Sequence, residues 1–310
     1  MYIKRLIIVF FLVLGISWLT GKLYDHRYKK RWDYLYFDKI DHLIKSDSSY
    51  DIIFLGDSRV HHGINPFYVD SVSGLNSYNF GFPGSDAAEL KLSSQLYLQN
   101  HPHPRVAVLV VNTETLGPAR ILKQRFPYLY YFNNDTVASY MRQNGFPVAI
   151  KYLPFLKYSF FDEYNKMSIF INGKQVPRFA HNNYKGFLNV DEFINRKGAV
   201  VFGNDVIETI SDSAVNYIKE ALDIFAKLGI KTVLVYPPEK KSSPEYSLPV
   251  KKQADSIFHG LAASYKIPFW HFDTAAVYTD EYFVDAVHLN EPGSRIFSGQ
   301  IADSIKTFLK

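Results

Sequence analysis

The sequence contains no cysteine among its 310 residues. This absence excludes disulfide bonds, zinc sites built from thiolates and a cysteine nucleophile. The chain also shows no repeat period and no low-complexity tract. A chain without cysteine is compatible with export from the cytoplasm, although it does not require export.

The sequence has little net charge outside a single stretch. Much of the formal charge of +5 comes from a basic cluster that directly follows an apolar segment: Lys22, Arg27, Lys29, Lys30 and Arg31. A membrane surface explains such a cluster more simply than nucleic acid does. Because no recognition-helix pattern and no basic stripe with interleaved aromatic residues occurs elsewhere, we predict no nucleic-acid partner.

The overall composition is that of a globular protein. Hydrophobic residues make up 47% and charged residues 21% of the chain, which excludes wholesale disorder, and the aromatic share of 16% is high. The length exceeds one average domain, but α/β domains of two hundred or more residues often fold around one sheet. One domain with an insertion is therefore expected.

The first residues have the composition of a membrane helix. Lys4 and Arg5 precede an apolar run from Leu6 to about Thr20, which is short for a bilayer span of about 20 residues but is extended by flanking aromatic residues and lysines. Because no convincing cleavage site follows, residues 1–24 are predicted to be an anchor or an uncleaved signal, with a buried first helix as the alternative. Cations on both sides of the run leave its orientation open.

Short β-rich runs alternate with helical patterns in most of the remaining chain. The runs cover residues 51–56, 77–80, 106–111, 231–236 and 268–272, and the helical patterns cover 86–99, 211–228, 250–265 and 292–309. This alternation predicts a parallel sheet with helices on both faces, in a domain that spans residues 51–310. Asn290 is the expected cap of the last helix, and Pro292 lies in its first turn. Residues 25–50 are interpreted as a polar, aromatic connector.

The alternation fails between residues 113 and 204. This interval contains aromatic runs such as RFPYLYYFNN, and Asn172-Gly173 between apolar residues predicts a tight hairpin. We interpret the interval as an insertion or subdomain. Its aromatic residues are expected to pack in a core, and the alternative is that they stack on sugar rings or close over an acyl chain.

A serine follows the first predicted strand, in the stretch IIFLGDSRVHHG. Ligands of open parallel sheets bind at the carboxyl ends of the strands, where Ser58 would face a substrate while the sheet holds its backbone. Taken alone, Gly56-Asp57-Ser58 is also ordinary turn chemistry.

A histidine and a carboxylate occur together near the other end of the chain. In YFVDAVHLNEPG, Asp285 and His288 stand three residues apart, just before the last helix. A serine nucleophile needs a base that accepts its proton, and that base needs an orienting group. The alternative is a helix-capping aspartate beside a solvated histidine.

Two further strand ends offer hydrogen-bond donors. Gly84, in NFGFPGSD, follows the second predicted strand and can present a backbone N–H with no side chain in the way. Asn112 follows VAVLVV and can present a side-chain amide. Donors of this kind stabilise the oxyanion that develops during acyl transfer.

These blocks, in this order, resemble those of the SGNH hydrolases, the GDSL esterase/lipase superfamily. The resemblance covers about residues 51–112 and 205–310. It implies a three-layer, flavodoxin-like α/β/α fold, with Ser58 as the nucleophile, His288 as the general base and acid, and Asp285 as the residue that orients it.

The resemblance also implies an oxyanion hole formed by Gly84, Asn112 and the backbone N–H of the serine. The third block departs from the family pattern. This block is the motif that contains the asparagine. In the family it usually reads G-x-N-D, whereas this chain has Val110-Val111-Asn112-Thr113, without the glycine or the aspartate.

Residues beside the serine are further pocket candidates: Asp57, Arg59 and His62. Arg59 replaces the usual leucine, and we expect it to form a surface ion pair, with contact to an acyl or sugar oxygen as the alternative. His61 and His62 are expected to belong to a polar turn or to line the pocket. Glu114 is expected to be a surface carboxylate, and the alternative is that it replaces a polar contact near the oxyanion asparagine.

The sequence therefore predicts a membrane-anchored serine esterase or O-acyltransferase that acts on acyl esters, foremost acetyl, of an envelope or exported polysaccharide. An anchor on such a domain is similar to relatives that work beside membrane-bound O-acyltransferases, which implies such a partner and a periplasmic or otherwise extracytoplasmic domain. The alternative is a non-catalytic accessory protein that binds glycan or the acyltransferase. No cofactor and no metal is predicted. His101 and His103 resemble a small metal-binding tract, but they lie in a proline-rich connector without a carboxylate.

Overall fold

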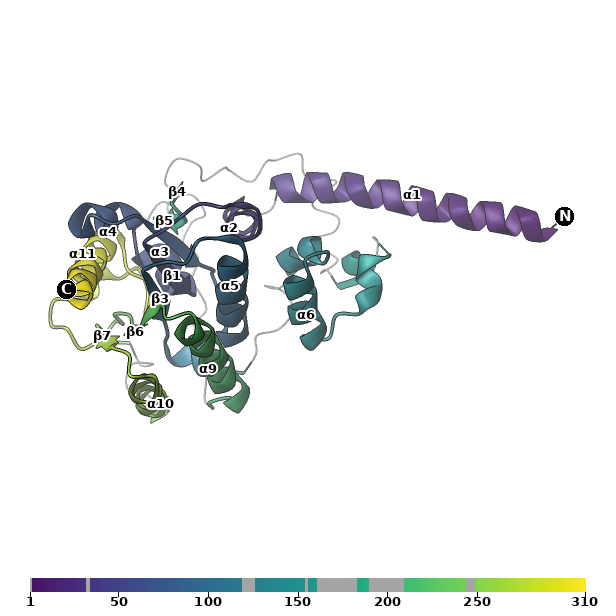
Figure 1. Cartoon of the computed structure of the whole chain (residues 1–310). Coiled ribbons are helices and arrows are strands. Elements are labelled where there is room, and N and C mark those ends of the chain that lie inside the picture. Colours follow the sequence, from purple (N-terminus) through teal and green to yellow (C-terminus); the bar gives the residue numbers. More distant parts are fainter. Residues whose placement is uncertain are drawn as a thin grey trace. The chain divides into compact units, whose positions relative to one another are not determined.

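The computed structural model describes residues 2–31, 34–118, 126–153, 156–160, 183–189, 209–243 and 249–310 (Figure 1). The chain forms two units. Unit 1 contains Met1–Ile40 and Ile121–Arg178, and unit 2 contains Asp41–Arg120 and Phe179–Lys310. The residues predicted as an insertion thus fall into both units, and the hairpin predicted at Asn172-Gly173 lies outside the described residues.

Unit 2 is built on a parallel five-stranded sheet. Its strands are β1 (Ile52–Gly56), β2 (Ser77–Gly81), β3 (Val106–Val110), β6 (Lys231–Tyr236) and β7 (Phe269–His271). Their order is β2-β1-β3-β6-β7, and every neighbouring pair is parallel. This is the flavodoxin-like order, in which the chain moves to one side after β1 and to the other side with β3. The switch point therefore lies between the carboxyl ends of β1 and β3.

Helices cover both faces of this sheet (Figure 1). On one face, α11 (Glu291–Leu309) packs against α3 (Ser58–Gly63) and α4 (Pro66–Ser73). On the other face, α5 (Ala87–Asn100) packs against α9 (Asp212–Lys227), and α10 (Pro249–Tyr265) lies beside α9 and β7. The prediction of a three-layer α/β/α domain is confirmed.

The side chains of β1 supply both halves of the core. Ile52 and Phe54 belong to the hydrophobic cluster that contains residues of α4 and α11, so the period of two along a strand places Ile53 and Leu55 on the opposite face. All four side chains are fully buried. Burial on both faces explains why the strand reads as an unbroken apolar run, and each such side chain stabilises the fold by about 1.5–3 kcal/mol.

The predicted elements of the sheet domain are confirmed to within two residues at each end. The helix caps follow the sequence as well. Asn290 Oδ1 accepts a hydrogen bond from the backbone N–H of Gly293 at 3.0 Å, and Asp86 Oδ1 accepts one from that of Glu89 at 3.0 Å. Both bonds satisfy a donor that the first helical turn leaves without an intrahelical partner.

Unit 1 combines the N-terminal helix with short helices from the middle of the chain. The long helix is α1 (Tyr2–Arg31), and the others are η2 (Phe126–Tyr131), α6 (Asp135–Gln143), η3 (Val148–Lys151) and η4 (Leu156–Phe160). Among the described residues, α1 alone has the length and apolar character of a membrane span, over Tyr2–Leu23 with a mean hydropathy of 2.2. A signal sequence has the same properties.

The segment predicted as a connector, residues 25–50, is largely helical. Helix α1 continues to Arg31, and α2 covers Tyr34–Lys45. Phe37, Ile40 and Leu43 are buried at a spacing of three, which is the one-sided pattern of a packed helix. The many aromatic and charged residues between these positions obscured that pattern in the sequence.

Candidate active site

Ser58 lies directly after β1, as the first residue of α3. The turn into this helix requires Gly56, whose φ is +155° and where a Cβ would lie only 2.6 Å from Val60 Cγ2. Asp57 then caps the helix, because its Oδ1 accepts a hydrogen bond from the backbone N–H of Arg59 at 2.9 Å. The capped turn holds Ser58 half-buried at the carboxyl edge of the sheet.

Asp285 and His288 lie on the loop that leads into α11. Asp285 Oδ1 accepts hydrogen bonds from the backbone N–H groups of Val287 at 2.9 Å and of His288 at 2.7 Å, which closes the loop into a tight turn. Its other oxygen, Oδ2, is 2.7 Å from His288 Nδ1. On the far side of the ring, His288 Nε2 is 2.8 Å from Ser58 Oγ. The structure thus brings the three residues into one hydrogen-bonded chain of alcohol, imidazole and carboxylate.

Electrostatic interactions determine which atoms carry protons in the hydrogen-bonded series of Ser58, His288 and Asp285. Burial by itself would raise the pKa of Asp285, but hydrogen bonds and charge interaction with His288, together with the two backbone N–H groups, hold this pKa below its ordinary value. The carboxylate therefore stays ionised at neutral pH and keeps the proton of His288 on Nδ1. Nε2, which faces Ser58 Oγ, is then the ring nitrogen that carries no proton.

The two predicted donors follow β2 and β3, the strands on either side of β1. Gly84 lies between β2 and α5 with a left-handed φ of +72°, and it is partly exposed. Asn112 follows β3 and caps the short helix η1 (Thr113–Leu116), since its Oδ1 accepts a hydrogen bond from the backbone N–H of Thr115 at 3.0 Å. Its Nδ2 donates to Asp57 Oδ2 at 2.7 Å. Asn112 is fully buried and is tied directly to the residue before the serine.

Arg59 is not a surface residue, so the expectation of a surface ion pair is wrong. It is only 4% exposed, and its guanidinium group forms ion pairs with Glu114 on η1 and with Glu239, which follows β6. Glu114, also expected at the surface, has only 19% of its side chain exposed. Arg59 points inward because α3 packs on the sheet. Its planar guanidinium group bridges the segment that follows β3 and the segment that follows β6.

The two carboxylates beside Arg59 have different environments. Burial raises the pKa of Glu114 even though Arg59 opposes this shift. Burial acts on Glu239 in the same direction, but here Arg59 and Lys251 together hold the pKa below its ordinary value. Lys251 Nζ lies 2.6 Å from Glu239 Oε2 and 2.6 Å from Asp273 Oδ2, so a chain of alternating charges runs inward from the residue after Ser58.

His271 stands at the end of this charge network. Its Nδ1 is 2.5 Å from Asp273 Oδ1, and its Nε2 is 2.8 Å from Asp255 Oδ1. Burial lowers the pKa of His271, but the two carboxylates outweigh burial and raise this pKa above its ordinary value. The protonated ring is therefore the form that the folded protein stabilises.

We expect the substitution His271→Gln to destabilise the protein mainly at acidic pH. A raised folded-state pKa means that the stabilisation is complete below the unfolded-state pKa of about 6.5 and is lost as pH rises through the folded-state pKa. Urea unfolding of both proteins at about pH 5.5 and about pH 9 should show a difference in free energy that shrinks with rising pH. His259→Gln is the control, because 63% of that side chain is exposed. A difference that is equal at both pH values would contradict the prediction.

His61 and His62 hold a hairpin that the sequence analysis missed. The hairpin consists of β4 (Asn183–Tyr184) and β5 (Phe187–Leu188). Nδ1 of His61 donates to Gly186 O at 3.1 Å, and Nδ1 of His62 donates to Leu188 O at 2.8 Å. The His62 ring lies 5.8 Å, centroid to centroid, from that of His288, so this residue is a neighbour of the triad.

The turn of this hairpin carried a signal in the sequence. Lys185 and Gly186 both have positive φ, at 47° and 85°, and a polar residue followed by glycine between aromatic residues is typical of a two-residue hairpin. A Cβ at Gly186 would lie 2.0 Å from Asn79 O, so only glycine permits this close approach to β2.

Within the described ranges, no group of three or more histidine, aspartate or glutamate side chains has a geometry that could hold a metal ion. His101, considered in the sequence as a metal ligand, instead bonds through both ring nitrogens to backbone carbonyls, those of Ser48 at 2.9 Å and His42 at 3.0 Å.

Comparisons with known proteins found structural likeness without sequence likeness. No family model and no curated protein matches the chain. A structure provisionally described as a platelet activating factor from Streptococcus pneumoniae is similar, with a TM-score of 0.47, 13% identity, and coverage of 93% of this chain and 98% of that chain. A lipase/acylhydrolase from Enterococcus faecalis has a TM-score of 0.44 and 14% identity, and the match covers 84% of this chain and 97% of that chain. A GDSL-like lipase from Bacteroides thetaiotaomicron has a TM-score of 0.43 and 12% identity, and the match covers 89% of this chain and 98% of that chain.

Proposed function

We propose that this chain is a membrane-anchored serine hydrolase or acyltransferase of the SGNH type. The observation that carries the proposal is the hydrogen-bonded chain from Ser58 Oγ through His288 to Asp285, with distances of 2.8 and 2.7 Å. The flavodoxin-like strand order supports it, because that order places Ser58 and Asn112 on either side of the switch point where ligands of such sheets bind.

The geometry supports a two-step acyl transfer. Ser58 Oγ attacks the carbonyl carbon of an ester while His288 Nε2 accepts its proton. The same proton then passes to the leaving alcohol, and an acyl group remains on Ser58. A water molecule or a sugar hydroxyl, deprotonated in turn by His288, attacks this acyl-enzyme and releases the acyl group as an acid or as a new ester.

The oxyanion formed in each step is stabilised by three donors in this proposal. They are the backbone N–H groups of Ser58 and Gly84 and the amide of Asn112. One hydrogen of the Asn112 amide is bonded to Asp57, and an amide nitrogen carries a second. Asn112 is fully buried in the structure, so in this proposal the groups that cover its second amide hydrogen move aside when the substrate carbonyl binds, and that hydrogen then serves the oxyanion.

We expect Asn112→Ala to lower kcat by about 10²- to 10³-fold, with a much smaller change in KM, because an oxyanion donor acts mainly in the transition state. Asn112→Ser is the matched control, since serine also caps a helix but lacks the amide donor. Steady-state kinetics with an activated acetyl ester should show a similar loss in both variants. Full activity in Asn112→Ser would contradict the role as donor and leave only the cap.

The substrate that we propose is an acylated carbohydrate, foremost an acetylated envelope or exported polysaccharide. The apolar, exposed α1 supports attachment to a membrane, and an extracytoplasmic domain beside a membrane-bound O-acyltransferase is the corresponding arrangement. Acyl analysis of envelope glycans from cells that carry wild type or Ser58→Ala separates the two reactions. More acylation with the variant indicates hydrolysis, and less indicates transfer.

The competing function is that of a non-catalytic accessory protein, which the altered third block favours. A fluorescent phosphonate that reacts with activated serines distinguishes the two. Wild type should be labelled, Ser58→Ala should not, and His288→Ala should be labelled weakly. Absence of labelling in folded wild-type protein would overturn the catalytic proposal.

A further inference from the structure

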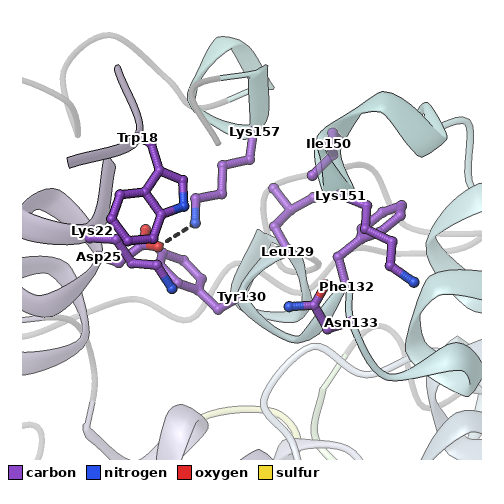
Figure 2. A pocket seen from close by; sticks show the side chains of 10 residues that line it. All are labelled: Trp18, Lys22, Asp25, Leu129, Tyr130, Phe132, Asn133, Ile150, Lys151 and Lys157. Carbon is purple, nitrogen blue, oxygen red and sulfur yellow. Dashed lines mark hydrogen bonds and ion pairs between the residues drawn. The ribbon is translucent and has the colours of Figure 1, made fainter. Parts of the chain in front are cut away.

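Unit 1 contains a cavity that the proposed catalytic function does not use. Its volume is about 180 Å³, and residues from four helices of the unit line it (Figure 2). Trp18, Lys22 and Asp25 come from α1, Tyr130 comes from η2, and two more lysines, Lys151 and Lys157, come from η3 and η4.

The cavity lies at the polar end of the apolar helix. Trp18, Lys22 and Asp25 are spaced by four and three residues, which places them on one face of α1. The apolar window ends at Leu23, so this face spans the change from apolar to polar sequence. In a membrane-spanning helix, tryptophan and lysine at such a boundary lie at the level of the lipid headgroups.

The charge of the cavity is strongly positive. Three lysines line it, together with one carboxylate, that of Asp25. Asp25 is bound to Lys157, with Oδ2 and Nζ 2.6 Å apart, as the dashed line in Figure 2 shows. Within the part of the chain that the structure describes, no ion pair joins Lys22 or Lys151 to a carboxylate. These two lysines are exposed and are free to meet an external anion.

Lys157 is unusually enclosed for a lysine. Only 9% of its side chain is exposed, and its ammonium group lies 4.5 Å from the centre of the Tyr130 ring. Burial lowers its pKa, although Asp25 opposes the shift. A second anion in the cavity would stabilise the protonated form further.

We propose that this cavity binds the phosphate of an anionic phospholipid headgroup. Lys22 and Lys151 contact the phosphate, Trp18 packs beside the upper acyl chains, and the Lys157–Asp25 pair forms the floor. A lipid fits the position better than a free anion does, because the cavity opens where the apolar helix would leave the bilayer. The inference rests on the proposed anchoring through α1, but not on the proposed acyl chemistry.

The test uses the full chain purified in a neutral detergent. Intact mass establishes first that α1 is retained, and circular dichroism with a cooperative thermal transition establishes that wild type and variants are folded. Calorimetric titration then compares dioctanoyl phosphatidylglycerol, dioctanoyl phosphatidylcholine and inorganic phosphate. We expect the anionic lipid to bind best, and Lys22→Gln combined with Lys151→Gln to weaken it by about thirtyfold. Lys4→Gln, at the other end of the same helix, is the matched control and should change nothing.

Three other results of the lipid titration would overturn the proposal. Equal affinity for inorganic phosphate would assign the cavity to a free anion, and binding that is the same in the double variant would place the lipid elsewhere. Loss of a co-purifying membrane protein in the double variant, with lipid binding unchanged, would assign the surface to a protein partner. Removal of α1 from the mature protein would overturn the anchoring as well, whereas retained α1 without lipid binding would overturn this site alone.

Discussion

Replacing Ser58 by alanine is expected to lower kcat for ester hydrolysis by about 10⁴- to 10⁶-fold, the range found when the serine of other acyl-transfer triads is removed. The reason is geometric. Ser58 Oγ is the oxygen within 2.8 Å of His288 Nε2, and alanine leaves the base with no alcohol to deprotonate. Water can then attack only without covalent catalysis.

The measurement is steady-state hydrolysis of an activated acetyl ester by the purified protein. Ser71→Ala is a suitable control, because that hydroxyl donates to Tyr68 O at 2.9 Å on α4 and has no contact with the triad. It should retain full activity. A Ser58→Ala protein that keeps more than about a hundredth of the wild-type kcat would show that another group is the nucleophile.

Replacing Arg59 by alanine is expected to lower the free energy of unfolding by about 3–5 kcal/mol, the usual effect of removing one partner from a buried ion pair. Arg59 is 4% exposed, and its guanidinium group faces both Glu114 and Glu239. Without it, Glu114 retains a largely buried carboxylate that pairs with no other cation among the described residues, because Lys251 pairs with Glu239 instead. Urea or thermal unfolding measures the loss.

A charge-free replacement separates the ion pair from simple packing. Arg59→Met, combined with Glu114→Gln and Glu239→Gln, removes the charges and keeps most of the volume. We expect this triple variant to recover much of the stability that Arg59→Ala loses, because it leaves no unpaired charge in the interior. If the triple variant is as unstable as Arg59→Ala, the loss comes from packing of the arginine stem rather than from the stranded carboxylate.

The sheet domain could be predicted from local patterns. A strand buried on both faces must be apolar throughout, as Ile52–Gly56 is, and a helix on its surface must repeat its apolar residues about every turn. Asn290 and Asp86 mark helix starts because each side chain satisfies a backbone donor nearby in the sequence. Such signals are short in range and therefore visible without a structure.

The triad candidates were also visible in the sequence, since Ser58 follows a strand and Asp285 and His288 share one loop. The environment of Arg59 was not. Its partner Glu239 is 180 residues away, and nothing near either residue shows that the other will face it. The hairpin at β4–β5 was missed for a related reason, because its strands have only two residues each and depend on His61 and His62 for support.

By itself, the sequence determined which residues can carry acyl-transfer chemistry, where the strands and helices lie, and that the first helix is apolar enough for a membrane. Tertiary structure alone decided that the serine, the imidazole and the carboxylate meet, that Arg59 is buried between two carboxylates, and that three lysines surround one cavity in unit 1. The physical reason is range: periodicity and capping act within a few residues, whereas contacts between side chains depend on how distant segments pack.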